Sequence, residues 1–451
     1  MKAWLDDIPN EGLIYYRSAF NAERLLPTTP KAIGEVLVSK SYEFIKPKQI
    51  REGLGRLLGI GVLLAEGDEH RRQRKLLMPA FQFRHIKDLY PVFWMKSAEM
   101  VTALSKTNSV PNASGTSPII SIIDWVSRCT LDIIGVAGMG QDFDAIQNPD
   151  GDLSTTYRTI SSPSSATRIL NVIAIVVPMW ILRRLPIKRN EDMIHAIRTI
   201  KSTSRNLIRS KNEKLAAGAN TDTDILSVAI TSGGFSEDDL VNQLMTFLAA
   251  GHETTASAMA WAVYLLCRHP EIQSRLREEV REQLPSISDG SSVTSQQIDN
   301  VHYLSAVCNE VLRLYPPVPM TLRQASKDTT IAGHFVPKDT TVFIPIWAIN
   351  VNKAMWGDDA EEFNPERWMA PGQANSGGAE SNYAMTTFLH GPRSCIGQAF
   401  AQAEFKCLLA AIVGKFELEA TDLDTPLDIV GGVTQKPKGG VPVRLKEVPG
   451  W

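Results

Sequence analysis

The chain has few cysteines, and their arrangement does not suggest cross-linking. Its 451 residues include five cysteines, at positions 129, 267, 308, 395 and 407. An odd number of widely scattered cysteines does not make a disulfide framework. The sequence therefore predicts a protein of a reducing compartment.

Long apolar runs are also lacking. No uninterrupted apolar stretch reaches the roughly 18 residues that a membrane-spanning helix needs, and no signal peptide follows Met1. The nearest candidate is the segment 169–182, which Asn171 and Pro178 interrupt and two arginines follow. This segment is either a buried helix or an interfacial segment that is apolar with a basic edge.

Neither sign of charge is in excess. The net charge is −2, from 47 basic and 49 acidic residues, and it gives no case for nucleic acid as a partner. No linker rich in Pro, Gly or Ser divides the chain, and it contains no internal repeat and no flavin or nicotinamide motif. A chain of 451 residues can bury a sizeable core. Its length alone would suggest about three domains, but because no linker divides it we expect a single domain over residues 1–451.

Apolar residues recur mostly at helical spacing along the chain. Short strand-like segments are expected at 13–16, 341–346 and 441–445, and low-complexity loops at 108–117 and 371–381. The sequence thus predicts a mainly α fold with a minor β portion.

Cys395 is the residue that points most directly to chemistry. An amphipathic helix is expected directly after it, so its sulfur would lie at a helix N-terminus, where free N–H groups favour a thiolate. Gly391 and Gly397 flank it and would let the backbone approach a large flat group. Arg393 would place a cation beside the thiolate.

Three other interpretations of Cys395 remain open from the residues alone. A lone buried cysteine commonly packs as a small apolar residue. A zinc site needs several ligands at short spacing, which His390 and Cys407 do not provide. A nucleophilic cysteine would need a histidine and an orienting partner elsewhere in the chain.

Residues 388–397 resemble the haem-ligand loop of the cytochrome P-450 family of haem-thiolate monooxygenases. The family pattern is Phe-x-x-Gly-x-Arg-x-Cys-x-Gly, and the chain fills it with Phe388, Gly391, Arg393, Cys395 and Gly397. The resemblance implies a haem b cofactor with its iron bound by Cys395. It also implies the family fold, mainly α with small β-sheets, with the haem between a long central helix and the ligand loop.

A second segment lies in a long helix expected over residues 236–268, which begins at a capping box, Ser236 to Asp239. Residues 250–255 place a glycine and two threonines, poor helix formers, in its middle. The Thr254 hydroxyl is expected to bond back to a carbonyl and to open the helix locally. The segment resembles the family's oxygen-activation motif. The resemblance implies that Gly251 gives O2 room, Thr254 hydrogen-bonds the bound oxygen and Glu253 helps to deliver protons.

The third segment carries charged residues, Glu310 and Arg313. Glu310 and Arg313 would by themselves suggest a weak i,i+3 pair. They resemble the family's Glu-x-x-Arg motif, and Arg367, within residues 363–368, resembles its partner arginine. The resemblance implies a buried brace for the ligand loop.

The fourth segment, residues 67–75, would by itself suggest a solvated basic face. It resembles the family helix that contacts the haem propionates, through His70 and Arg74. Arg323 matches the other propionate arginine, and Arg393 makes a fourth group.

The resemblance covers nearly the whole chain and implies an enzyme. It would take electrons from NADPH through a separate cytochrome P-450 reductase, with cytochrome b5 as a further candidate partner and a ferredoxin as the alternative. One atom of O2 would enter a lipophilic small molecule, by hydroxylation or epoxidation, in secondary metabolism. The pocket walls are expected at 46–64, 155–190, 244–250, 318–321 and 431–434. The alternatives are a haem-thiolate isomerase, dehydratase or peroxide-using enzyme, and a non-catalytic haem sensor or carrier.

The expected location depends on the N-terminus. Residues 4–16 resemble the stretch that follows the membrane anchor of microsomal family members. We therefore expect a monomer that is soluble as given, with peripheral membrane contact. With an anchor it would lie on the cytosolic face of the endoplasmic reticulum.

Overall fold

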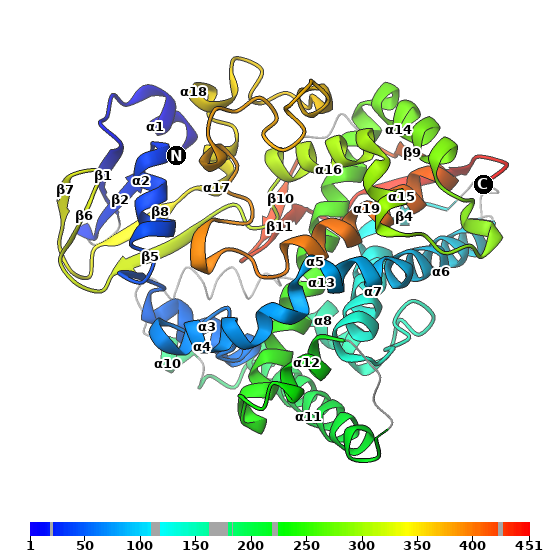
Figure 1. Ribbon diagram of the computed structural model, residues 1–451, viewed down its shortest axis with the longest axis horizontal. Helices are drawn as coiled ribbons and strands as arrows, with labels where there is room; N and C mark the ends of the chain where they lie inside the picture. The colour runs from blue at the N-terminus through cyan, green and yellow to red at the C-terminus, as the bar shows by residue number, and fades with distance from the viewer. Residues whose placement is uncertain (19–20, 110–117, 162–178, 183, 219–223, 423–426) are drawn as a thin grey trace.

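Helices fill one side of the molecule, and the larger sheet lies at the other (Figure 1). The structure is a computed structural model that describes residues 1–18, 21–109, 118–161, 179–182, 184–218, 224–422 and 427–451. The expected interfacial segment lies mostly outside these ranges, because only residues 179–182 of it are described. Most of the expected loop 108–117 lies outside them as well.

The described α-helices vary in length from one turn to nine. They are α1 (Lys2–Asp7), α2 (Pro30–Gly34), α3 (Lys48–Leu58), α4 (Gly67–Leu77), α5 (Phe83–Ile86), α6 (Tyr90–Asn108), α7 (Ile122–Ile133), α8 (Asp152–Ser161), α10 (Met179–Leu182), α11 (Lys188–Ala216), α12 (Ile225–Thr231), α13 (Glu237–Arg268), α14 (Pro270–Gln283), α15 (Ser295–Asn300), α16 (His302–Leu314), α17 (Ile346–Asn350), α18 (Lys353–Trp356) and α19 (Gln398–Lys415). None of them combines the length and the apolar composition needed to cross a bilayer, within the residues that the structure describes.

Short turns of 3₁₀ or π geometry link these helices. They are η2 (Glu35–Ser39), η3 (Met78–Phe81), η4 (Lys87–Leu89), η5 (Ile134–Gly138), η6 (Ile287–Asp289), η7 (Pro365–Trp368), η8 (Asn382–Ala384) and η9 (Gly391–Arg393).

The strands form small sheets and hairpins. They are β1 (Leu13–Arg17), β2 (Glu23–Pro27), β3 (Phe44–Ile45), β4 (Ile120–Ser121), β5 (Thr321–Ala325), β6 (Thr329–Ile331), β7 (His334–Val336), β8 (Thr341–Ile344), β9 (Phe416–Ala420), β10 (Ile429–Gly431), β11 (Gln435–Pro437) and β12 (Pro442–Glu447). The largest sheet has the order β1-β2-β8-β5-β3, and only β2 and β8 pair in parallel. A second sheet has the order β4-β12-β9, and β6–β7 and β10–β11 are hairpins.

The mainly α fold with small sheets is confirmed. The three expected strands correspond to β1, β8 and β12, with ends shifted by at most two residues. The strand expected at 341–346 stops at Ile344, because Pro345 precedes the new helix α17. Residues 371–381 form turns, as expected of a loop.

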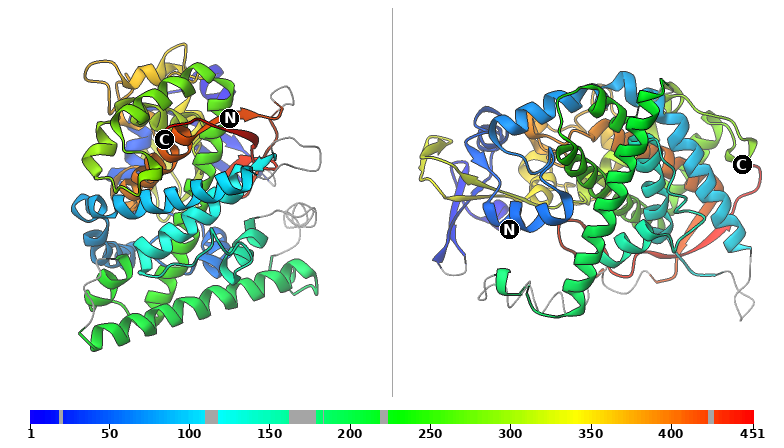
Figure 2. Two further views of the ribbon diagram at one scale, coloured as in Figure 1. Left: turned by 90° about the vertical axis from the view of Figure 1, so that its right-hand side faces the viewer. Right: turned by 90° about the horizontal axis from the view of Figure 1, so that it is seen from below.

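Helix α13 is the central element. Ser236 caps it: its hydroxyl accepts from the Asp239 amide at 3.1 Å, and the Asp239 carboxylate accepts from the Ser236 amide at 3.2 Å, which is the predicted capping box. The helix packs against α7, α11, α16 and α19. Figure 2 shows α11 along one edge of the molecule, outside α13. The core around α13 and α19 is the largest in the protein, so both helices are held firmly beside the site.

Candidate active site

A large cavity separates α13 from the loop that precedes α19. Its volume is about 1540 Å³. Cys395, Phe388 and Gly397 line one side, and the segment 249–255 of α13 lines the other. Each of the five wall segments expected from the sequence contributes residues to the lining. The cysteine loop and the middle of the long helix therefore meet across one space.

Cys395 faces this cavity. Its accessible surface opens into the cavity, although protein surrounds the residue. The Cys395 amide donates to the Phe388 carbonyl at 2.8 Å, and α19 begins three residues later. Burial raises the pKa of Cys395, while the Gly397 amide and the Arg74 charge oppose that rise. Without a metal ion the thiol form is therefore favoured, so the helix N-terminus alone does not produce the expected thiolate.

The cation beside Cys395 is Arg74 rather than Arg393. The Arg74 guanidinium donates to the Ser394 carbonyl at 2.6 Å and to its hydroxyl at 3.2 Å. The Arg393 side chain instead turns to Glu66, with which it forms an ion pair, and donates to the Ala65 carbonyl at 2.9 Å. Glu66 and the Ala65 carbonyl thus hold the Arg393 guanidinium, and the charge that acts on the pKa of Cys395 is that of Arg74.

The flanking glycines have different roles. Gly391 has φ of +76°, and a Cβ there would lie 2.5 Å from the Leu37 carbonyl of η2. It therefore allows close backbone packing in a conformation that other residues rarely adopt. Gly397 lines the cavity, where an added Cβ would meet only Phe81, at 3.8 Å. Only Gly397 thus matches the expected approach to a large group.

His70, Arg74, Arg323 and Arg393 all line one part of the cavity, as the sequence suggested. Burial lowers the pKa of Arg323 to about 10, and the nearby Arg393 adds to the effect. Burial, with help from the Arg393 charge, lowers the pKa of His70 to about 4. His70 is therefore neutral near pH 7, and its Nδ1 lies 3.1 Å from the Tyr42 hydroxyl.

Lys46 belongs to the same cluster, although the sequence identified it only as pocket wall. Burial lowers the pKa of its ammonium well below the usual range, and Arg323 and Arg393 lower it further. The Glu66 carboxylate lies near these groups, and its charge partly opposes the lowering of the pKa of Lys46, His70 and Arg323. Arg393 Nε has no hydrogen-bond partner among the described residues, whereas Nη1 belongs to the ion pair with Glu66. This edge of the cavity therefore fits a ligand with carboxylates.

The segment 250–255 stays helical throughout. The Thr254 hydroxyl donates to the Ala250 carbonyl at 2.8 Å, as expected, but the hydrogen-bond pattern is not opened. A Cβ on Gly251 would lie 2.9 Å from Ile134 Cγ1, so this glycine lets α13 pack closely against η5. Its proposed role in giving O2 room stays a prediction. Glu253 accepts a hydrogen bond from the Thr434 hydroxyl at 3.0 Å.

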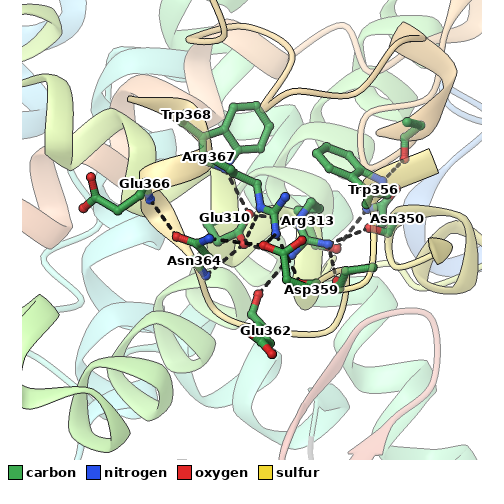
Figure 3. A network of polar contacts seen from close by, with 12 residues as sticks. Glu310, Arg313, Asn350, Trp356, Asp359, Glu362, Asn364, Glu366, Arg367 and Trp368 are labelled. Carbon is green, nitrogen blue, oxygen red and sulfur yellow. Dashed lines mark hydrogen bonds and ion pairs between the residues drawn. The ribbon is translucent and has the colours of Figure 1, made fainter. Parts of the chain in front are cut away.

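Glu310, Arg313 and Arg367 form one buried ion cluster (Figure 3). Glu310 Oε1 lies 2.8 Å from Arg313 and 3.0 Å from Arg367, and the Trp368 indole donates to Oε2 at 3.0 Å. Arg313 also donates to three backbone carbonyls. Each charge is thus paired and hydrogen-bonded, the condition under which a buried ion pair is tolerated.

Asn350 connects this cluster to the ligand loop. Its amide nitrogen donates to the Arg313 carbonyl at 3.1 Å and to the Thr387 hydroxyl at 2.7 Å. Its amide oxygen accepts from the Thr386 backbone at 2.8 Å. Thr387 precedes Phe388, whose carbonyl binds the Cys395 amide. Hydrogen bonds, together with the peptide bond between Thr387 and Phe388, therefore connect Glu310 to the cysteine.

The structure bears on the other interpretations of Cys395. Among the described residues, no three His, Cys, Asp or Glu side chains come together to hold a metal ion, so a zinc site has no support. All five cysteines are free, as the sequence predicted. Asn350 was not predicted as a site residue, and Lys46 and Thr434 were predicted only as pocket wall, because nothing local in the sequence marks their partners.

Comparison with known proteins identifies the family. The sequence model of the cytochrome P-450 family matches residues 19–442. The chain belongs to the cytochrome P-450 family. It is 49% identical over 457 residues to the cytochrome P-450 monooxygenase sphH of Aspergillus fumigatus, covering 100% of this chain and 84% of that protein. It is 44% identical over 496 residues to the cytochrome P-450 monooxygenase FUM15 of Gibberella moniliformis, covering 99% and 83%.

These relatives place the chain among fungal cytochrome P-450 monooxygenases, which are enzymes. The cofactor of the family is haem b. The residues present fit that cofactor: a thiol lines the cavity, and the buried cations Lys46, Arg323 and Arg393, which line it as well, outnumber the one carboxylate beside them, Glu66. A non-catalytic haem sensor or carrier therefore has no support.

Proposed function

We propose that Cys395 binds the haem iron and that the enzyme inserts one atom of O2 into a lipophilic substrate. One observation carries the proposal: Cys395 and the segment 249–255 face each other across a single cavity with a cationic edge. Haem ligated by a thiolate supplies the oxygen activation. Residues 1–451 would serve as a single haem domain.

The cations at the cavity edge would bind the two haem propionates. Arg323, Arg393 and Lys46 carry the charge, and His70 contributes a neutral ring. Arg74 would act mainly on the ligand loop, since its guanidinium is bound to Ser394. Burying these cations without a counter-charge is unfavourable, and two carboxylates would offset that cost.

The chain's own residues would handle protons and exclude water on the α13 side. Thr254 lines the cavity, and its hydroxyl would be able to donate a hydrogen bond into the cavity after leaving the Ala250 carbonyl. Glu253 lines the cavity beside it and would supply protons. An intact acid–alcohol pair favours a monooxygenase over an isomerase, dehydratase or peroxide-using enzyme. Apolar side chains such as Leu54, Phe247 and Ile346 suit a lipophilic substrate.

The electrons would come from NADPH through a separate flavoprotein reductase. The chain contains no flavin or nicotinamide motif, so an external donor is required. Cytochrome b5 and a ferredoxin are the further candidates. We also propose that the protein acts at the cytosolic face of the endoplasmic reticulum. The test of location is fractionation of the protein expressed at its natural level in its own cells.

The ferrous–CO spectrum tests the proposed ligand. The wild-type protein is expected to bind one haem b and to show the red-shifted Soret band of thiolate ligation. Cys395→Ala and Cys395→His should abolish that band. Cys308→Ala is the matched control, because Cys308 is buried in α16 away from the cavity. A normal thiolate band in both Cys395 variants would assign the iron to another ligand.

A further inference from the structure

One face of α13 carries Glu253 and also holds the β10–β11 hairpin. Glu253, Ser257 and Trp261 follow one another at intervals of four residues, so they lie on the same face of the helix. The Ser257 hydroxyl donates to the Gln435 carbonyl at 2.6 Å, and the Trp261 indole donates to the same carbonyl at 2.9 Å. The hairpin is therefore fixed to the face of α13 that carries Glu253.

The groups that anchor the hairpin are themselves held in place. Ser257 and Trp261 are buried, and the Trp261 ring stacks on the Tyr315 ring with centroids 4.2 Å apart. The Gln435 amide also donates to the Pro317 carbonyl, at 2.8 Å. The hairpin is thus tied both to α13 and to the segment that follows α16, and the turn that precedes Gln435 has little freedom to move.

This turn presents Thr434 to Glu253. A Cβ on Gly431, at the start of the turn, would clash with the Thr434 carbonyl oxygen, so the tight turn requires glycine there. Thr434 is 8% exposed, and its hydroxyl donates to Glu253 Oε1 at 3.0 Å. Both residues line the cavity. A fixed backbone therefore holds one carboxylate oxygen of Glu253 at the cavity wall.

The position of the Glu253 carboxylate matters for its chemistry. An acid or base acts only within hydrogen-bond reach of the atom that exchanges the proton, directly or through one water. A glutamate side chain has several rotatable bonds, and beside a cavity of about 1540 Å³ its carboxylate has many positions open to it. A displacement of about 1 Å can cost about a hundredfold in rate. A fixed donor to Oε1 removes much of this freedom.

We propose that Thr434 is a positioning residue, whose hydroxyl holds the Glu253 carboxylate where it can deliver protons. The inference rests on the proposed function, because it concerns the proton supply of the same site. The hydrogen bonds of Gln435 already fix the hairpin without the Thr434 hydroxyl. A purely structural role for that hydroxyl would only duplicate them. Thr434 itself transfers no proton.

The first measurement is the infrared band of CO bound to the ferrous enzyme, which responds to charge near the CO and needs no turnover. Wild type and Thr434→Ser should each give one narrow band. Thr434→Val keeps the volume of the side chain but removes the hydroxyl, so the band should broaden or split as the Glu253 carboxylate takes several positions. In the Glu253→Ala background, Thr434→Val should leave the band unchanged.

The second measurement is the rate at which O2 reoxidises the dithionite-reduced enzyme, because a supply of protons speeds this reaction. Thr434→Val should be about tenfold slower than wild type, which is part of the roughly hundredfold or more that a positioned acid contributes. Thr434→Ser keeps the donor and should stay near the wild-type rate. In the Glu253→Ala background, Thr434→Val should cause no further loss, because the group that it positions is gone.

An unchanged band or an unchanged rate in Thr434→Val would overturn the proposal. Equal effects of Thr434→Val with and without Glu253 would also overturn it, since the hydroxyl would then not act through the carboxylate. Thr434→Ala removes the same hydroxyl and takes the place of Thr434→Val if that variant binds no haem. The red-shifted Soret band of the wild-type ferrous–CO complex reports separately on the proposed function, because it depends on Cys395.

Discussion

Among single residues, Glu404 shows how burial acts on a charged group. Glu404 lies on α19, is fully buried, and neither carboxyl oxygen has a hydrogen-bond partner among the described residues. Burial raises the pKa of Glu404 well above its usual value of 4.5, and the nearby Thr255 hydroxyl offsets only part of that rise. The folded protein therefore keeps a proton there that the unfolded chain releases above about pH 4.5.

Glu404→Gln should therefore change the pH dependence of stability. In wild type the free energy of unfolding should fall as pH rises above 4.5, by up to about 1.4 kcal/mol per pH unit from this group. Glutamine cannot ionise, so the variant should gain stability relative to wild type between pH 5.5 and 8. Thermal unfolding across this range measures the difference, with the exposed Glu11→Gln as control. Parallel curves for Glu404→Gln and wild type would show that the carboxyl is not a buried acid.

Among the elements, the Glu310 cluster ties α16 to the ligand loop. Glu310→Ala leaves Arg313 and Arg367 without their buried counter-ion, which should cost about 3–5 kcal/mol. We expect little soluble, haem-loaded protein, measured as haem absorbance per protein. Asp68→Ala is the control, because it breaks the exposed i,i+3 pair with Arg71, which is worth less than about 1 kcal/mol. Full yield and haem content in Glu310→Ala would mean that the brace is dispensable.

Helix α13 carries the prediction about turnover. Thr254→Ala removes a hydroxyl that lines the cavity, so oxygen should be released before it reaches substrate. The variant should keep consuming NADPH in the presence of reductase, but with more hydrogen peroxide and less product per NADPH. Thr254→Ser keeps the hydroxyl and should retain most of the coupling. An unaltered ratio of peroxide to product in Thr254→Ala would show that Thr254 takes no part in proton delivery.

Local sequence signals predicted the elements better than the contacts between them. The capping box at Ser236 set the start of α13, because such signals act within a few residues. Reasoning from neighbouring positions also placed Arg393 beside the Cys395 sulfur. In the structure the charge that lowers the pKa of Cys395 is that of Arg74. Arg74 reaches Ser394 across 320 positions, and the Thr434–Glu253 bond spans 181. Nothing within a helical or strand repeat encodes pairs this far apart.

Over the whole molecule, the cofactor and the folded chain should stabilise each other. Lys46 is buried near other cations, so Lys46→Met should raise the melting temperature of the haem-free protein. The same change should weaken haem retention, because a partner of the propionates is lost. Melting curves with and without haem, together with haem transfer to apomyoglobin, measure the two effects. If Lys46→Met shifted the melting temperature in the same direction with and without haem, this account would be contradicted.

The cavity of about 1540 Å³ with its cationic edge also affects how much enzyme a cell contains. A newly synthesised chain that has not met haem keeps this space unfilled and these buried charges without the propionates. Such a chain opens more often and is cut sooner by proteases, because degradation follows the population of open molecules. A ligand that binds only the folded form shifts that balance, by about 4 kcal/mol at a thousandfold excess over its dissociation constant. The abundance of this enzyme should therefore follow the supply of haem in the cell, even when its messenger RNA is constant.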